Sequence, residues 1–148
     1  MNTAPKTPEP IQHTLTFDVS IDPQFVEYLT KYNDIFAHNR AGSWAFGVRP
    51  TRIKGVSNHV WLVYEQDDEA PPTPKEIAEA RRQYRAGMSP FVSGMKLPAR
   101  WCVLDRDASI RAWGEGVKRW GVDWYEDVDA ERENVVVQLS LLGEIRYG

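Results

Sequence analysis

The sequence predicts a single α+β domain in which helices pack on an antiparallel sheet. Short segments that alternate between apolar and polar residues, which is typical of half-buried strands, are interspersed with segments whose apolar residues recur at helical spacing. The chain has 148 residues, the length of one ordinary domain. Its hydrophobic content of 42% and charged content of 26% are those of a globular protein with its own core.

The N-terminal region divides into a tail and a first predicted strand. Residues 1–12 contain three prolines among small and polar residues, so we expect a disordered tail ahead of a single domain over residues 13–148. From His13 to Ile21 the side chains alternate between apolar and polar types. Because successive side chains of a strand point to opposite faces, this alternation predicts a half-buried strand.

A helix and a pair of strands are predicted next. Asp22 and Pro23 provide a helix start, because a carboxylate caps the free amide groups and proline suits the first helical position. Apolar residues at helical spacing extend this helix to about His38. Alternating residues over 44–48 and 60–64 then predict the second and third strands.

A second helix and a fourth strand complete the predicted sheet. Thr73 and Glu76 have the spacing of a capping box, which marks a helix start. The apolar stripe of that helix consists of Ile77, Ala80, Tyr84 and Met88. Residues 100–104 form a short apolar segment, which predicts a strand.

Two more helices are expected toward the C-terminus. Asp105 or Asp107 caps the first of them. Its apolar stripe consists of Ile110, Trp113, Val117 and Trp120. Gly114 and Gly116 weaken this helix by roughly 1 kcal/mol each relative to alanine, which suggests that another group packs closely there. Gly121 ends the helix.

The final segment fits either a helix or a strand. Val135, Val136 and Val137 favour a strand by propensity. The acidic residues just before them favour a helix N-terminus, because carboxylates interact well with the free amide groups there. We expect a helix from about residue 129 to 142 and keep a strand over 134–142 as the alternative.

The order of these elements is strand, helix, strand, strand, helix, strand, which is the ferredoxin-like βαββαβ order, followed by two extra C-terminal helices. Such a sheet is antiparallel and carries its helices on one face. The C-terminal pair must therefore cover the other face, cap an edge of the sheet, or form a partner surface. The order describes a layout and assigns no family.

Charge argues against nucleic acid as the general partner. The net charge is −3, and Lys54-Gly55 is not followed by the aromatic residues of an RNA-recognition motif, so RNA or single-stranded DNA binding is a minor alternative. Residues 75–120 carry ten basic and five acidic residues, whereas residues 121–148 carry two and seven. Two segments of opposite charge can complement each other within a fold or across a dimer interface.

Cysteine content and hydropathy bear on location. Cys102 is the single cysteine, which excludes an internal disulfide and suits a reducing compartment. The N-terminal region has no long apolar run, so neither a signal peptide nor a transmembrane helix is expected. We therefore expect a cytoplasmic protein without a membrane partner.

The sequence contains no motif for catalysis, for a metal or for a cofactor, and we expect none of them. Phosphate-binding glycine loops are absent, and the three histidines lack metal-ligand spacing. The alternating acids that begin at Asp127 do not form a calcium loop, because Arg132 and Gln138 occupy its sixth and twelfth positions. The enzyme alternative is a carboxylate-assisted or metal-assisted hydrolase that uses Asp105, Asp107, Asp123 and Asp127.

Tryptophans are the most informative residues of the chain. Four of the six lie between positions 101 and 124, and Trp113 and Trp120 share one helix face because they are seven residues apart. Trp124 and Tyr125 are followed by a dense acidic run, a composition that resembles an interface anchor with a polar rim. We expect three or four of the six in the core, with Trp44, Trp61 and Trp124 as candidates for exposure.

Together these patterns predict a small non-catalytic binding protein of the inhibitor or accessory-factor type, whose partner is another protein or a second copy of itself. The predicted contact residues are Trp113, Trp120, Trp124, Tyr125, Arg81, Arg82 and Arg85. Tryptophan, tyrosine and arginine are the residue types that dominate the energetics of protein interfaces. Besides the hydrolase and the nucleic-acid-binding domain, a ligand-sensing domain of ferredoxin-like layout is a further alternative.

Overall fold

The computed structural model describes residues 7–14, 16, 18–32, 44–51, 59–66, 71–87 and 100–148. In chain order the elements are α1 (Pro23–Glu27), the π-helical turn η1 (Tyr28–Tyr32), β1 (Ala45–Val48), β2 (Trp61–Glu65), α3 (Pro74–Arg85), β3 (Trp101–Leu104), α4 (Arg106–Trp120), the 3-10 turn η2 (Trp124–Asp127) and α5 (Ala130–Leu142). This mixture of helices and an antiparallel sheet confirms the α+β class. The predicted continuation of the first helix over 33–38 and the residue Met88 lie outside the described residues.

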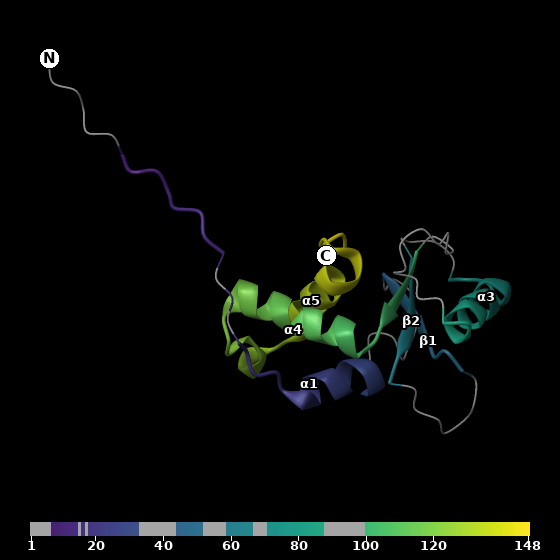
Figure 1. The fold of residues 1–148 in the computed structure, drawn as a ribbon. Coiled ribbons are helices and arrows are strands. Elements are labelled where there is room, and N and C mark those ends of the chain that lie inside the picture. Colours follow the sequence, from purple (N-terminus) through teal and green to yellow (C-terminus); the bar gives the residue numbers. More distant parts are fainter. Residues whose placement is uncertain are drawn as a thin grey trace, which may run out of the picture.

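The sheet contains three described strands in the order β1-β2-β3, and both pairs are antiparallel. Ala45 lies opposite Glu65 in the first pair, and Trp61 lies opposite Leu104 in the second. Helix α3 covers one face of this sheet, and α1, α4 and α5 cover the other (Figure 1). Of the three places considered for the C-terminal helices, they take the second face of the sheet.

The structure does not show the predicted ferredoxin-like order. In that layout the strands before and after the second helix are parallel and another strand separates them, whereas β2 and β3 are direct antiparallel neighbours. The described residues of the expected first strand, His13 to Ile21, form no strand, and Val19 is 37% exposed. Alternation makes a segment suitable for a sheet. In the ferredoxin-like layout the first strand would lie between β2 and β3, but these two strands pair directly, so no space is left for it.

The sheet separates two hydrophobic clusters, because successive residues of each strand point to opposite faces. Trp61 and Val63 of β2 face the larger cluster, which contains residues of α1, α4 and α5. Leu62 and Tyr64 face the smaller cluster beneath α3. This partition of β2 is the one that the sequence predicts.

Side chains cap the helices where the sequence predicts that they begin. The Asp22 carboxylate accepts a hydrogen bond from the Gln24 amide at 2.9 Å. The Thr73 hydroxyl accepts from the Glu76 amide at 3.2 Å, and the Glu76 carboxylate accepts from the Thr73 amide at 3.1 Å, which completes the capping box. Asp105, not Asp107, caps α4 by accepting from the Ala108 amide at 2.9 Å.

The C-terminal segment is a helix, so the strand alternative for residues 134–142 is wrong. Asp129 caps α5 by accepting from the Arg132 amide at 2.8 Å. Gly143 ends α5 in the left-handed conformation with φ +76°, which glycine adopts without steric cost. Local capping and the acidic first turn therefore outweigh the strand propensity of the valines, which pack into the larger cluster as helical residues.

A buried glutamine attaches the C-terminal residues to the body of the domain. The Gln138 side chain, which is 0% exposed, accepts hydrogen bonds from the amides of Arg146 and Tyr147 at 2.9 Å each. The Tyr147 ring stacks on Trp44 with centroids 5.7 Å apart. The Glu65 carboxylate accepts from the Arg146 guanidinium at 2.9 Å and from the Tyr147 hydroxyl at 2.7 Å. The chain end is thus tied to the end of β2.

Arg49 joins η1 to the strands. Its guanidinium donates hydrogen bonds to the carbonyls of Thr30 at 2.5 Å, Lys31 at 2.6 Å and Val60 at 3.0 Å. The same group lies 3.7 Å from the centre of the Trp61 ring, within the range of a cation–π interaction. Burial lowers the pKa of Arg49, and the positive charge faces helical carbonyls, where a cation is favourable.

Trp124 packs directly on the backbone of α4. A Cβ atom at Gly116 would lie 2.1 Å from the Trp124 ring, a separation that no real side chain tolerates. Trp124 is only 1% exposed, so its ring has no room to move away. At Gly114, two positions earlier on the same helix, a Cβ atom would have no other atom within 4 Å. The close approach expected from the paired glycines therefore occurs at Gly116 alone.

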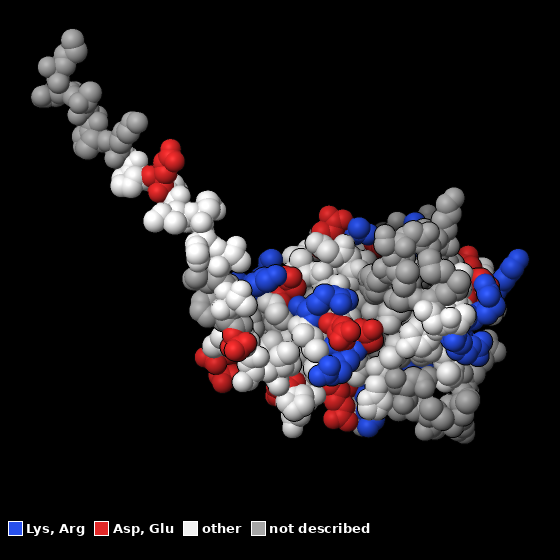
Figure 2. Space-filling model, viewed as in Figure 1, with Lys and Arg blue, Asp and Glu red and all other residues white. Residues whose placement is uncertain are grey.

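Charged side chains are distributed unevenly over the two ends of the molecule. Figure 2 shows basic side chains over the end that carries α3 and acidic side chains over the end that carries η2. The basic segment, residues 75–120, also includes Lys118 and Arg119 at the end of α4 next to η2, so its charges are not confined to the α3 end.

We expect Gly116→Ala to lower the free energy of unfolding by about 2 kcal/mol or more, because the methyl group overlaps a buried ring. The matched control Gly114→Ala adds a methyl group in open space and should raise it by up to about 1 kcal/mol through helix propensity. Urea unfolding followed by circular dichroism measures both. Equal stability of the two variants would contradict the close contact.

Arg49→Lys should lower the free energy of unfolding by about 2 kcal/mol, because one ammonium group cannot serve three carbonyls that the guanidinium reaches from two nitrogens. Arg85→Lys, at an exposed position of α3, is the control and should change stability by less than about 0.5 kcal/mol. Thermal and urea unfolding report the difference, and an Arg49→Lys protein as stable as the control would contradict the role of this residue.

Candidate functional site

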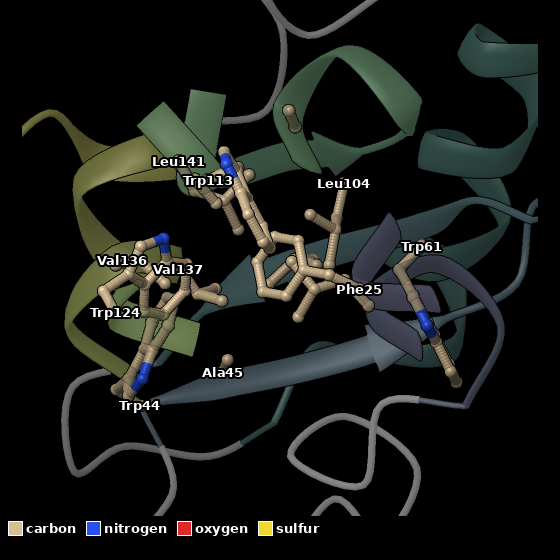
Figure 3. Packing of buried hydrophobic residues seen from close by; sticks show 14 residues of the cluster. Phe25, Trp44, Ala45, Trp61, Leu104, Trp113, Trp124, Val136, Val137 and Leu141 are labelled. Atoms are coloured by element: carbon tan, nitrogen blue, oxygen red, sulfur yellow. The ribbon is translucent and has the colours of Figure 1, made fainter. Parts of the chain in front are cut away.

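Most of the tryptophans lie in the core. Trp44, Trp61, Trp101, Trp113 and Trp124 are each no more than 8% exposed. Trp113 and Trp124, two of the predicted contact residues, lie with Phe25 inside the larger cluster (Figure 3), with ring centroids 5.2 to 5.5 Å apart. Both rings therefore make their contacts inside the domain and stabilise its core. Trp44, Trp61 and Trp124, which the sequence singled out as candidates for exposure, are all buried.

Trp120 is half-buried and lies at the outer edge of this cluster. Its ring packs on Trp124 at 5.9 Å between centroids. Two guanidinium groups lie beside it, that of Arg132 at 4.9 Å and that of Arg119 at 5.7 Å from the ring centre. Arg132 also donates a hydrogen bond to the Trp124 carbonyl at 3.4 Å. These contacts fix the orientation of a ring that remains partly open to solvent.

Tyr125 is also half-buried and, like Trp120, packs on Trp124, with ring centroids 5.7 Å apart. One side of its ring packs on Phe25 at 5.3 Å and on Trp113 at 5.5 Å. Burial raises the pKa of the Tyr125 hydroxyl, and the carboxylates of Asp22 and Glu133 raise it further. The hydroxyl is therefore neutral at physiological pH and can act as a hydrogen-bond donor to a partner.

Apolar and acidic residues that are close to one another in the chain around η2 form the candidate surface. Val122 is 62% exposed, an unusual position for a large apolar side chain, and the acidic residues next to it are exposed as well. We call this set the η2 surface: Trp120, Val122, Asp123, Tyr125, Glu126 and Asp127. It has an aromatic and apolar centre with an acidic rim, the composition typical of an interface.

Sequence reasoning missed some members of this site. It did not select Val122, although an isolated valine between Gly121 and Asp123 in a predicted turn was a usable signal. It also missed the contribution of Arg132, which lies twelve positions after Trp120. Only the packing of α5 against α4 brings that guanidinium to the ring.

The predicted basic residues lie on α3, across the sheet from α4 and η2, which carry Trp113, Trp120 and Trp124 (Figure 1). Arg81 donates to the Arg49 carbonyl at 2.8 Å, so its charge is partly used within the fold. Arg82 donates to Glu79 at 2.9 Å, and this hydrogen bond, with help from Gln83, lowers the pKa of Glu79 to about 2. Arg85 is exposed. The structure therefore does not combine the arginines and the tryptophans in one site.

The carboxylates of the hydrolase alternative are not brought together either. Asp105 and Asp107 lie at the start of α4, whereas Asp123 and Asp127 follow its end. A helix of 15 residues separates the two pairs by about 22 Å at 1.5 Å per residue. Within the described ranges, no three histidine, cysteine, aspartate or glutamate side chains lie close enough to hold a metal ion together.

Cys102 is half-buried on β3 and its thiol donates a hydrogen bond to the Leu141 carbonyl at 3.6 Å. Burial raises the pKa of the thiol to about 11, and the Glu65 carboxylate adds to this effect. Because the thiolate is the reactive form, this environment suits a structural cysteine.

Comparison of the chain with protein-family models, with curated proteins and with solved structures finds no match. Among the helices of the described residues, none combines the length and the apolar character needed to cross a membrane. Function is therefore inferred from the side chains and surfaces described above.

We expect the native Cys102 thiol to react with iodoacetamide at least about tenfold more slowly near pH 8.5 than the thiol of the urea-unfolded chain, because only the unfolded thiol is substantially ionised there. Since the folded state holds this proton more tightly, the free energy of unfolding should also fall as the pH rises from about 8.5 toward about 11. Cys102→Ala should lose this part of the fall. Similar alkylation rates for native and unfolded protein would contradict the assignment.

Proposed function

We propose that this protein is a non-catalytic protein-binding domain that contacts its partner through the η2 surface. The observation that supports this function best is Trp120, a partly exposed ring held in one orientation by two guanidinium groups and by Trp124. A ring that is already ordered loses little conformational entropy when a partner covers it. Tryptophan in such a setting is the residue type that most often dominates binding energy.

The rim of the η2 surface defines the chemistry of the partner. Asp123, Glu126 and Asp127 are exposed around Val122 and Trp120. A partner with an apolar pocket and a basic rim would match this arrangement, because opposite charges speed association and discourage wrong pairings. An inhibitor or accessory factor that acts by covering a basic surface of another protein fits this description.

A second copy of the chain is the other partner that the charges favour. The α3 end carries Arg81, Arg82 and Arg85, and the η2 end carries the acidic rim. Contact between the η2 surface of one copy and α3 of the next would join different surfaces, which produces a ring or a chain of subunits and not a two-fold dimer. This arrangement would give the predicted arginines a binding role that they lack within one copy.

Location follows from the same proposal. Cys102 is a free thiol in the structure, and a free thiol is maintained in a reducing compartment. We expect the protein to act in the cytoplasm.

We expect Trp120→Ala to weaken the complex by about 2 kcal/mol or more, which is roughly 30-fold in Kd, because it removes the ordered ring at the centre of the contact. Val122→Asp should have a similar effect by placing a charge in the apolar centre. The matched control is Ile145→Ala, which truncates an apolar side chain that is 44% exposed outside the η2 surface.

Affinity capture from a nuclease-treated lysate of the native host, read by mass spectrometry, and sedimentation of the purified protein measure hetero- and self-association. The proposal requires a stoichiometric complex that both η2-surface variants lose and the control retains, with circular dichroism unchanged. A complex that is indifferent to both variants, or a bait that remains alone and monomeric, would refute it.

A further inference from the structure

A pocket lies between α1, η1 and the first part of α4. It has a volume of about 540 Å³ and is bounded by α1 and η1 on one side, by the start of α4 on another, and by His59 just before β2. Pockets that hold small molecules typically measure about 300–1,000 Å³. The size is therefore that of a site for a small organic ligand.

The walls of the pocket are mainly apolar. Pro23 and Val26 line it from α1, Ile21 from the residues just before α1, and Ile110 from α4. Thr30, also in the wall, uses its hydroxyl to donate to the Val26 carbonyl at 2.8 Å. This part of the pocket offers a ligand apolar contact and little hydrogen bonding.

Two basic side chains and one acidic side chain are among the described residues that line the same pocket. The Arg106 guanidinium and the His59 imidazole line it, and neither makes a hydrogen bond or an ion pair with the described residues. Glu27, the acidic residue among the described residues of the lining, pairs with Lys31 at 3.4 Å. The Arg106 guanidinium is therefore available to pair with an anionic group of a ligand.

Two irregular backbone segments border the pocket. The η1 wall is a π-helical turn, a conformation that is rare and is found most often near functional sites. His59 has φ +49°, in the left-handed region that residues other than glycine adopt infrequently. Arg49 holds the η1 wall in place through the carbonyls of Thr30 and Lys31. The wall is thus formed before any ligand arrives.

We propose that this pocket binds a small amphipathic carboxylate, with its apolar body against Val26 and Ile110 and its carboxylate toward Arg106 and His59. Arginine is the side chain whose fork of donors best matches a carboxylate. Among the described residues the lining of this pocket shares no residue with the η2 surface, and Ile110, its last residue on α4, lies ten positions before Trp120, about 15 Å along the helix axis. The proposal of a ligand site in this pocket does not depend on the proposed protein-binding function.

The test is a titration of the ¹⁵N-labelled full chain with octanoate, followed by amide chemical shifts. Octanoate should cause saturable shifts at residues 21–30, at His59 and at residues 106–110. Two probes of the same apolar length serve as charge controls, 1-octanol and octyltrimethylammonium. Both should bind at least tenfold more weakly. Shifts located elsewhere, no saturation up to millimolar octanoate, or equal binding of octanol would each overturn the proposal.

Substitution of the pocket cation tests the carboxylate contact directly. Arg106→Gln should weaken octanoate binding at least fivefold and leave octanol binding unchanged. Arg85→Gln removes the same charge from α3, on the other face of the sheet, and should leave both unchanged. Ile110→Trp, which fills the pocket, should abolish binding of both probes. Octanoate affinity that survives Arg106→Gln and Ile110→Trp in folded protein would refute the site.

Discussion

The contact between the Trp124 ring and the Gly116 backbone is the constraint on which the C-terminal half of this structure depends. The ring occupies the space where any residue other than glycine at position 116 would place its side chain. In that position it also reaches Phe25 and Trp113, so one residue joins α1, α4 and the turn η2. With this turn fixed, α5 runs back along α4 and both helices cover one face of the sheet.

Burial of Trp124 also decides which aromatic residues remain available to a partner. Because its ring fills the interior of the helical layer, Trp120 is displaced to the edge, where Arg119 and Arg132 lie beside it. Tyr125 uses one side of its ring for the core. The packing of the core therefore determines which aromatic residues lie on the proposed binding surface. These residues, Trp120 and Tyr125, pack on buried aromatic rings.

Polar groups connect the parts that the hydrophobic clusters do not. Arg49 ties η1 to Val60, the residue just before β2, through backbone carbonyls, and Gln138 ties the chain end to α5. Such buried donors and acceptors must be satisfied, which restricts how the elements can be arranged. The same Arg49 contacts shape the η1 wall of the pocket, whose apolar lining and Arg106 guanidinium differ in chemistry from the aromatic and acidic residues of the η2 surface.

The sequence by itself determined what depends on neighbouring residues. Capping by Asp22, Thr73 and Asp129, the alternation along β2 and the close approach at a glycine of α4 all follow from local chemistry and periodicity. Only the tertiary structure decided which strands pair. Alternation in residues 13–21 shows that this segment could form a strand, but it does not show whether the sheet has a free edge where that strand could pair. It likewise decided that Trp113 and Trp124 are core residues and Trp120 is not. All three tryptophans share helical or near-helical spacing, so the sequence does not distinguish them. What distinguishes them is contact with distant residues: Trp113 and Trp124 pack on Phe25 in the core, whereas Trp120 lies beside Arg132.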